Sequence, residues 1–227
     1  MKILFPLFIA SVLLLIIANT SSSQDDKKPL LAPVYPKLAD WFVEQYDLAG
    51  LEGVALDIGS GRGDLILELC SRTRLHWVNA DINAKAFPAF LQRIDQAGFT
   101  GRASAMLADA QHLPFKDNYA DVIVSRGSIP FWGDVKAGLA EVYRVLKPGC
   151  VAYIGRGFSE NVPVETARAI RDKQNKSRSF PAYDPDEAEA TWRKYLMELG
   201  IENFRIIRPR PAGSDGINYG VWIEMKK

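Results

Sequence analysis

Short apolar runs alternate with amphipathic stretches along most of the chain. Apolar runs bounded by turn-forming residues are typical of buried parallel strands, whereas apolar positions three and four residues apart are typical of helices. The runs predict seven strands, at residues 54–58, 77–81, 103–107, 121–125, 151–154, 204–207 and 221–225. The amphipathic stretches predict helices at residues 38–46, 64–70, 84–97, 135–146 and 187–199.

This alternation predicts an α/β domain with a mostly parallel seven-stranded sheet, right-handed crossovers and helices on both faces. The last two predicted strands follow each other without a helix between them, which predicts one antiparallel edge strand. Lys147-Pro-Gly149 indicates a turn before the fifth strand. Residues 161–184 form a long polar segment, and we expect them to act as a mobile cover.

The first residues differ in character from the rest. Lys2 precedes an apolar run at 3–18, and a polar stretch follows it. This order is typical of a secretory signal, with Ser21 and Ser23 as the small residues of a cleavage site, or of an uncleaved membrane anchor. We therefore expect a targeting element at 1–23, a linker at 24–35 and one domain at 36–227. The expected location is membrane-anchored or exported, and the side of the membrane stays open.

Charge and cysteine content narrow the possible partners. The 227 residues include 28 basic and 27 acidic side chains, a net charge of +1, so no general electrostatic attraction to nucleic acid is expected. Cys70 and Cys150 are the two cysteines, and no paired Cys/His spacing suggests a metal site. Buried thiols are the expectation for both, with a disulfide left open. We expect a small-molecule ligand, no metal and no nucleic acid.

The first predicted strand leads into a glycine-rich turn, Asp57-Ile-Gly59-Ser-Gly61-Arg-Gly63, which opens a helix. Glycines let the backbone turn sharply and let a ligand approach where a Cβ would block it. The spacing differs from the dinucleotide-binding pattern, because its third glycine would fall at Asp64. A carboxylate at a helix N-terminus is also a poor neighbour for a pyrophosphate. The turn therefore suits a ligand that is not a diphosphate.

The same turn resembles motif I of the class I S-adenosylmethionine-dependent methyltransferases. Asp81, 24 residues after Asp57, matches the family carboxylate that accepts hydrogen bonds from both ribose hydroxyls. Asp109 matches the residue beside the adenine, and Ala110 would offer its backbone N–H to that ring.

Further segments are similar to one branch of this class, the ubiquinone/menaquinone-biosynthesis-like (methyltransferase type 11) branch, which acts mainly on small molecules. They are Asp109-Ala-x-x-Leu-Pro-Phe115, Tyr119-Ala-Asp-Val-Ile123 and Glu141-Val-Tyr-Arg-Val-Leu-Lys-Pro-Gly149. The resemblance covers residues 36–158 well and extends through the last strands. It implies a Rossmann-like fold and S-adenosylmethionine as cofactor. The cofactor-binding residues that it implies are Asp57, Gly59, Ser60, Gly61, Gly63, Asp81, Ile82, Asp109, Ala110 and Ser125.

The acceptor side offers fewer signals. Arg126 follows the fourth strand and would clamp an anionic group or form a surface ion pair. Trp132 suits either a cavity wall or core packing, Arg156 lies on the rim after the fifth strand, and Tyr35 would fold over the site. No general base stands out, because His76 precedes a strand and His112 falls in the loop beside the adenine. The catalytic residues stay open.

The expected activity is methyl transfer to an unidentified small molecule, and the N-terminal segment makes a lipophilic acceptor plausible by analogy. No Asn/Asp-Pro-Pro-Tyr/Phe motif follows the fourth strand, which argues against an enzyme that methylates amino groups of nucleic acids. One alternative is a non-catalytic membrane-associated module that holds a nucleoside or S-adenosylmethionine. A nicotinamide-dependent oxidoreductase is a further alternative, disfavoured by Asp64.

Overall fold

A computed structural model describes residues 30–176 and 184–227 of the protein. The helices within these residues are α1 (Val34–Tyr46), α2 (Asp64–Cys70), α3 (Phe87–Gln96), α4 (Val135–Val145), α5 (Val164–Lys176) and α6 (Pro185–Glu198), with short 3₁₀ turns at Ala84–Ala86 and Ile129–Phe131. The strands are β1 (Val54–Ile58), β2 (His76–Asp81), β3 (Ala103–Leu107), β4 (Ala120–Arg126), β5 (Leu146–Gly157), β6 (Phe204–Ile207) and β7 (Gly220–Lys226).

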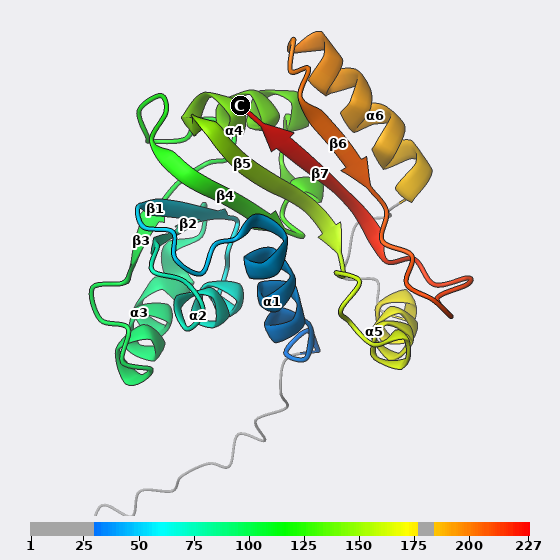
Figure 1. Ribbon diagram of the computed structural model, residues 1–227, viewed down its shortest axis with the longest axis horizontal. Helices are drawn as coiled ribbons and strands as arrows, with labels where there is room; N and C mark the ends of the chain where they lie inside the picture. Colours follow the sequence, from blue (N-terminus) through cyan, green and yellow to red (C-terminus); the bar gives the residue numbers. More distant parts are fainter. Residues whose placement is uncertain (1–29, 177–183) are drawn as a thin grey trace, which may run out of the picture.

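The seven strands form one sheet in the order β3-β2-β1-β4-β5-β7-β6 (Figure 1). β1 to β5 run parallel, and β7 pairs antiparallel with both β5 and β6. The α/β class and the single antiparallel strand are thus confirmed. That strand lies one place in from the edge, however, because β6 takes the edge position.

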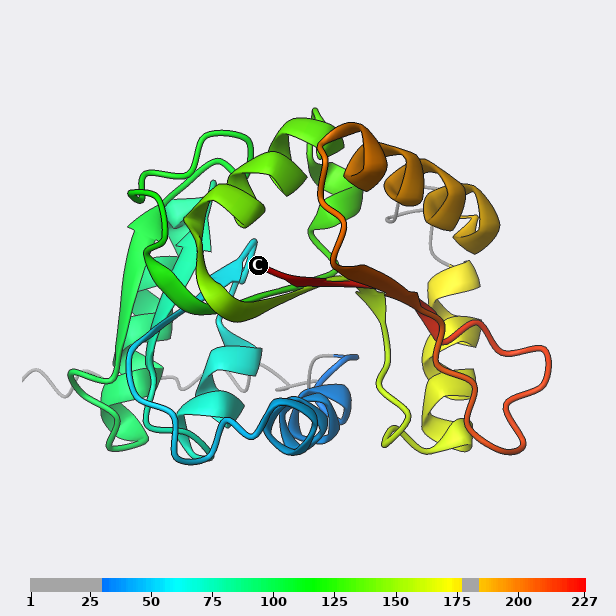
Figure 2. The same ribbon diagram turned by 45° about the horizontal axis from the view of Figure 1, so that its top comes forward.

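Helices cover both faces of the sheet. Figure 2 shows α1, α2, α3 and α5 below the sheet and α4 and α6 above it. The alternation of side chains along each strand divides the core accordingly. On β4, Val122 and Val124 pack toward α1 and α2, whereas Ile123 packs toward α4. The sheet therefore has an apolar layer packed on each of its faces.

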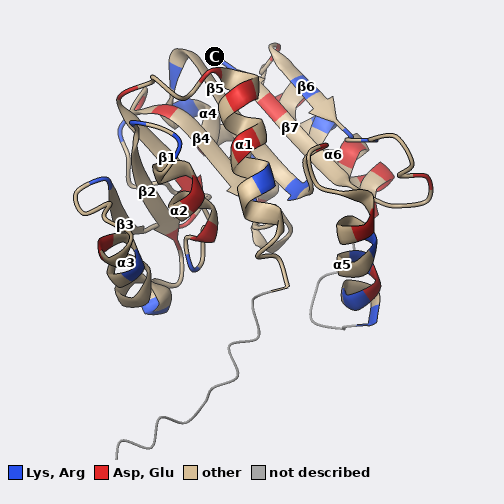
Figure 3. Cartoon of the chain, turned by 60° about the horizontal axis from the view of Figure 1, so that its bottom comes forward, with Lys and Arg blue, Asp and Glu red and all other residues tan. Residues whose placement is uncertain are grey.

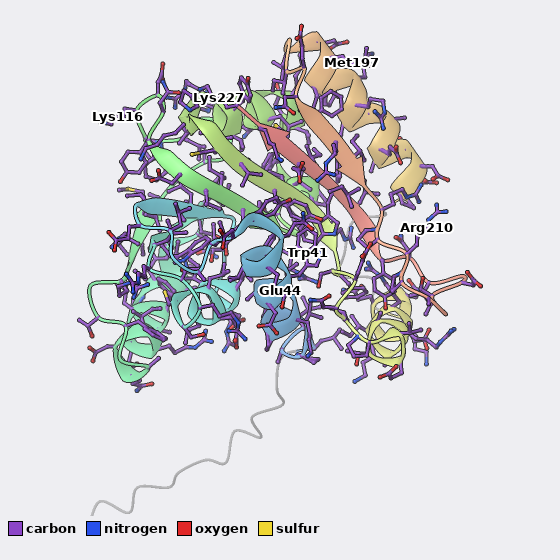
Figure 4. All side chains as sticks on the ribbon, in the orientation of Figure 1. Trp41, Glu44, Lys116, Met197, Arg210 and Lys227 are labelled. Carbon is purple, nitrogen blue, oxygen red and sulfur yellow. The ribbon has the colours of Figure 1, made fainter. Side chains whose placement is uncertain are left out.

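Helix α1 begins at Val34, inside the predicted linker 24–35, so the folded domain starts earlier than the sequence pattern predicts. Its aromatic residues face the sheet: the Trp41 ring lies 4.9 Å from that of Tyr153, while Glu44 on the same helix is exposed (Figure 4). No helix of the described residues is long and apolar enough to span a membrane. The predicted targeting element at 1–23 lies outside the described residues and stays a prediction.

The segment predicted as a polar cover contains a regular helix, α5, in its described part. Ala167 and Ile170 are its buried residues and pack against Val34 and Tyr219. The remaining face carries charges of both signs (Figure 3). The sequence pattern did not predict this helix, because only two buried apolar residues, three positions apart, dock an otherwise polar segment. The role of a mobile cover stays a prediction.

Strand β5 begins at Leu146 and includes the predicted turn Lys147-Pro-Gly149. At the predicted turn the strand is irregular. The pairing of β5 with β4 shifts register between Ala120 and Val122, and Gly149 has φ of +79°. Cys70 and Cys150 are both free thiols, so the disulfide that the sequence left open is absent.

Candidate functional site

The glycine turn after β1 is built from three glycines with different neighbours. Gly59, Gly61 and Gly63 have φ between +55° and +69°, a conformation that side chains disfavour. A Cβ on Gly59 would lie 2.2 Å from Ser128 Cβ, and one on Gly63 would lie 2.2 Å from the Phe90 ring. A Cβ on Gly61 would meet nothing within 4 Å. The outer glycines therefore allow close packing, and the middle one borders open space.

Strand β2 holds the middle of this turn. Asp81 accepts hydrogen bonds from the backbone N–H of Gly61 and of Asn83, both at 2.8 Å and through different carboxylate oxygens. Asn79 Nδ2 donates to the carbonyl of Gly61 at 3.1 Å. Each Asp81 oxygen retains lone pairs for a further donor. Asn79 was not among the predicted site residues, although an amide within a predicted apolar strand was a visible signal.

The loop after β3 is fixed by Gln111. Asp109 accepts from the backbone N–H of Gln111 at 2.9 Å and from its side-chain amide at 3.0 Å, and these bonds, the backbone one first, lower the pKa of the carboxyl. Gln111 in turn accepts from the backbone N–H of Asp134, the N-cap residue of α4. Asp109 is therefore held ionised as an acceptor. Gln111 was missed because its partner lies 23 residues away.

Two serines after β4 bind the end of β1. The hydroxyls of Ser125 and Ser128 donate to the carbonyl of Ile58 at 2.7 and 3.0 Å. Trp132 Nε1 donates to the Ser128 hydroxyl at 3.0 Å, and its ring packs on Gly138 of α4. Trp132 therefore packs in the core, and it also borders a cavity at the end of β4.

A cavity of about 310 Å³ opens between the carboxyl ends of β2 and β4. We call it the β2–β4 cavity. Its wall includes Asp81, Asp109 and Ala110. Ile82 and Phe131, which are 70% and 62% exposed, also border it. Apolar groups around three polar ones are the composition expected for a site that takes a planar ring and fixes it by hydrogen bonds.

A second cavity of about 380 Å³, the α1–α5 cavity, lies on the other side of the glycine turn. In Figure 1, α1 and α5 flank the carboxyl end of β5, where this cavity opens. Its lining includes Leu30, Leu31, Tyr35, Ser60, Gly61, Arg62, Asp64, Arg156, Arg171 and Gln174. Gly59, Arg126 and Gly127 border both cavities, so the two cavities are adjacent.

The predicted site residues divide into two groups by position. Eleven of them line one or both cavities: Tyr35, Gly59, Ser60, Gly61, Asp81, Ile82, Asp109, Ala110, Arg126, Trp132 and Arg156. Asp57, Gly63 and Ser125 line neither and lie beneath the surface of the site. Leu30, Leu31 and the α5 residues Arg171 and Gln174 were not predicted.

Asp57 is the buried charge of the site, with 3% exposure. Burial raises the pKa of its carboxyl to about 7; the Ser60 hydroxyl and Arg126 oppose this rise, and Asp81 adds to it. Burial also lowers the pKa of Arg126, whose guanidinium carbon lies 5.5 Å from the centre of the Tyr35 ring. Asp57 and Arg126 therefore attract each other electrostatically within the site.

The segment at residues 141–149, which resembles the methyltransferase type 11 branch, has a structural role. Glu141 accepts from the backbone N–H of Leu113 at 2.8 Å, and Arg144 donates to the carbonyls of Leu113 and Phe115 at 3.1 and 2.9 Å. The pair thus clamps the loop that carries Asp109. His76 binds Gly101 and Ser104 and joins β2 to β3.

Comparison with known proteins agrees with this geometry. A family model described as a methyltransferase domain matches residues 56–154. The ubiquinone/menaquinone biosynthesis C-methyltransferase UbiE of Geotalea daltonii is 32% identical over 99 residues, 43% of this chain and 42% of that protein. The chloroplastic 2-methyl-6-phytyl-1,4-hydroquinone methyltransferase of Arabidopsis thaliana is 33% identical over 49% of this chain and 32% of that protein. The matches thus span less than half the length of these curated relatives.

A solved structure extends the match to nearly the whole chain. A Methanococcus maripaludis protein assigned as an S-adenosyl-L-methionine-dependent methyltransferase has a TM-score of 0.73 and 30% identity, and the match covers 89% of both chains. An Aquifex aeolicus methyltransferase, with a TM-score of 0.58 and 16% identity, shares the fold. The chain therefore belongs to the class I S-adenosylmethionine-dependent methyltransferases, with relatives in the ubiquinone/menaquinone-biosynthesis-like branch, and its cofactor is S-adenosylmethionine.

Proposed function

We propose that the chain methylates a partly apolar small molecule that binds in the α1–α5 cavity, with the adenosine part of the cofactor in the β2–β4 cavity. The adjacency of the two cavities, which share Gly59, Arg126 and Gly127 as lining residues, carries this proposal, because the reacting groups must meet where the cofactor and acceptor sites adjoin. Leu30, Leu31 and Tyr35 supply apolar wall on the acceptor side. The names of the curated relatives, a quinone-biosynthesis and a hydroquinone methyltransferase, also favour an acceptor with an apolar ring.

The described residues fit the cofactor. The Asp81 carboxylate has lone pairs left for two ribose hydroxyls, and Asp109 with the Ala110 N–H suits the adenine edge. Ile82 and Phe131 would lie against the two faces of the adenine ring. Gly61 has open space where a Cβ would project, which leaves room for the methionine part to pass over the turn.

When bound, S-adenosylmethionine would supply a methyl group on a sulfonium; an electron pair of the acceptor would form the new bond to this methyl, and the electron pair of the broken C–S bond would pass to sulfur. The chain's own contribution is to hold the acceptor in line with that bond and to keep water out. Neither histidine of the chain lines the two cavities, so we assign no general base. Positioning alone supplies on the order of several kcal/mol when the acceptor is already nucleophilic.

Calorimetric titration of the full chain with S-adenosylmethionine, S-adenosylhomocysteine and NADH tests the cofactor assignment. We expect Kd values of about 1–100 μM for the first two ligands and no heat with NADH. Incubation with methyl-labelled cofactor and a panel of phenols, quinols and aromatic acids then tests the acceptor class. Label transfer to nucleic acid or protein, with none to the panel, would refute a small-molecule acceptor.

A pair of glycine variants separates cofactor binding from folding. Gly61→Val fills open space and is expected to weaken S-adenosylhomocysteine binding at least about tenfold, with a stability loss of roughly 1–2 kcal/mol from its positive φ. Gly63→Ala places its Cβ against Phe90 and is expected to cost about 2–3 kcal/mol of stability. Urea denaturation and calorimetry on both variants check this. Equal affinities in the two folded variants would contradict the assignment of Gly61.

A further inference from the structure

Arg126 occupies the junction of the site. It ends β4, borders both cavities, and has its guanidinium over the face of Tyr35. Its Nε is buried and has no hydrogen-bond partner. Among the residues that the structure describes, no carboxylate forms an ion pair with Arg126.

Such a side chain is costly in a folded protein. A buried donor without a partner costs about 1–3 kcal/mol, and more when the group is charged. Two other arginines near the sheet end have partners of this kind: Arg171 Nε donates to the Asn218 carbonyl at 2.7 Å, and Arg93 forms an ion pair with Asp64. Asp57 contributes only a weak electrostatic attraction to Arg126 from beneath. A ligand that supplies an oxyanion would satisfy the orphaned donor.

We propose that Arg126 binds an acidic group of the methyl acceptor, a carboxylate or a phosphate. The guanidinium presents N–H donors in a planar fork that matches either oxyanion. Arg156, Arg171 and Asp64 line the same cavity, while Leu30 and Leu31 line its apolar part. The acceptor is therefore an amphipathic acid rather than a neutral lipophile. This inference rests on the proposed function, because it takes the α1–α5 cavity as the acceptor site.

The test uses full-length protein saturated with S-adenosylhomocysteine and titrated with benzoate, phenyl phosphate and benzamide, followed by ligand-observed NMR. We expect at least one of the two anions to bind about tenfold tighter than benzamide, which has the same ring without the charge. Arg126→Gln should abolish this preference. Arg126→Lys keeps the charge, loses the fork and should retain only part of it. The control is Arg210→Gln, since Arg210 is exposed on the connection between β6 and β7 (Figure 4) and should keep the full preference.

A second titration excludes the competing ligand, the cofactor's own carboxylate. S-adenosylhomocysteine carries that carboxylate and 5′-methylthioadenosine lacks it. If Arg126 binds the acceptor, Arg126→Gln leaves the ratio of the two affinities within about threefold of wild type. A tenfold loss for S-adenosylhomocysteine alone would overturn the proposal and assign Arg126 to the cofactor. Equal binding of the anions and benzamide to wild type would overturn it as well. Failure of wild type to bind S-adenosylhomocysteine would refute the proposed function itself.

Discussion

Asp81→Ala is expected to weaken the binding of S-adenosylhomocysteine about a hundredfold or more. The Asp81 carboxylate lines the β2–β4 cavity and is the acceptor proposed for both ribose hydroxyls. Hydrogen bonds to a charged acceptor contribute roughly 1.5–3 kcal/mol each, so the loss of two corresponds to at least two orders of magnitude in Kd. The variant also frees the N–H groups of Gly61 and Asn83, which loosens the glycine turn. Calorimetric titration measures the effect.

Two further variants make this result specific. Asp81→Asn keeps the shape and one acceptor oxygen, and is expected to lose about tenfold in affinity. Asp95→Ala removes an exposed carboxylate at the end of α3 and should leave the affinity unchanged. Near-wild-type affinity in a folded Asp81→Ala protein would contradict the assignment of the ribose site.

The sequence predicts the strands of this fold well because most of them are buried on both faces. The sequence of β7 also differs from that of an edge strand, and the prediction of an antiparallel edge strand did not take this difference into account. Gly220–Met225 are all buried, the pattern of an interior strand, whereas β6 includes the exposed Arg205. A run that is buried on both faces indicates a strand inserted between two others. The stacking of Trp222 on Tyr153, at 4.8 Å, shows the contact that holds it there.

The site was predictable where strand ends carry glycines or carboxylates, because parallel strands bring their carboxyl ends to one edge. Asp81, Asp109 and the glycine turn are of this kind. The position of Tyr35 over Arg126 was not predictable in detail, since it depends on how the first turn of α1 packs, 91 residues away in the chain. Nor was the contribution of α5, whose docking depends on partners in α1 and before β7.

Asp57→Asn is expected to stabilise the fold at pH 8 and to change little at pH 4.5. The Asp57 carboxyl ionises near pH 4 in an unfolded chain and near 7 in the folded protein, because burial raises its pKa. Between these values the unfolded state releases a proton that the folded state keeps. Stability therefore falls as pH rises through this interval and levels off above about 7. The asparagine variant lacks this loss and is expected to be more stable than wild type at pH 8 by about 2–3 kcal/mol.

Urea denaturation of wild type and Asp57→Asn at pH 4.5, 6 and 8 measures the effect. Subtracting one free energy of unfolding from the other removes the contribution of groups that titrate alike in both proteins. Asp95→Asn, a substitution at an exposed position, is the control. Asp57→Asn should also bind S-adenosylmethionine about tenfold less tightly, since an ionised Asp57 attracts the positively charged cofactor. Greater stability with weaker binding would mean that the buried carboxylate serves the cofactor at the expense of the fold. Greater stability with unchanged binding would mean that its charge plays no part in cofactor recognition, and a stability gain independent of pH would refute the raised pKa.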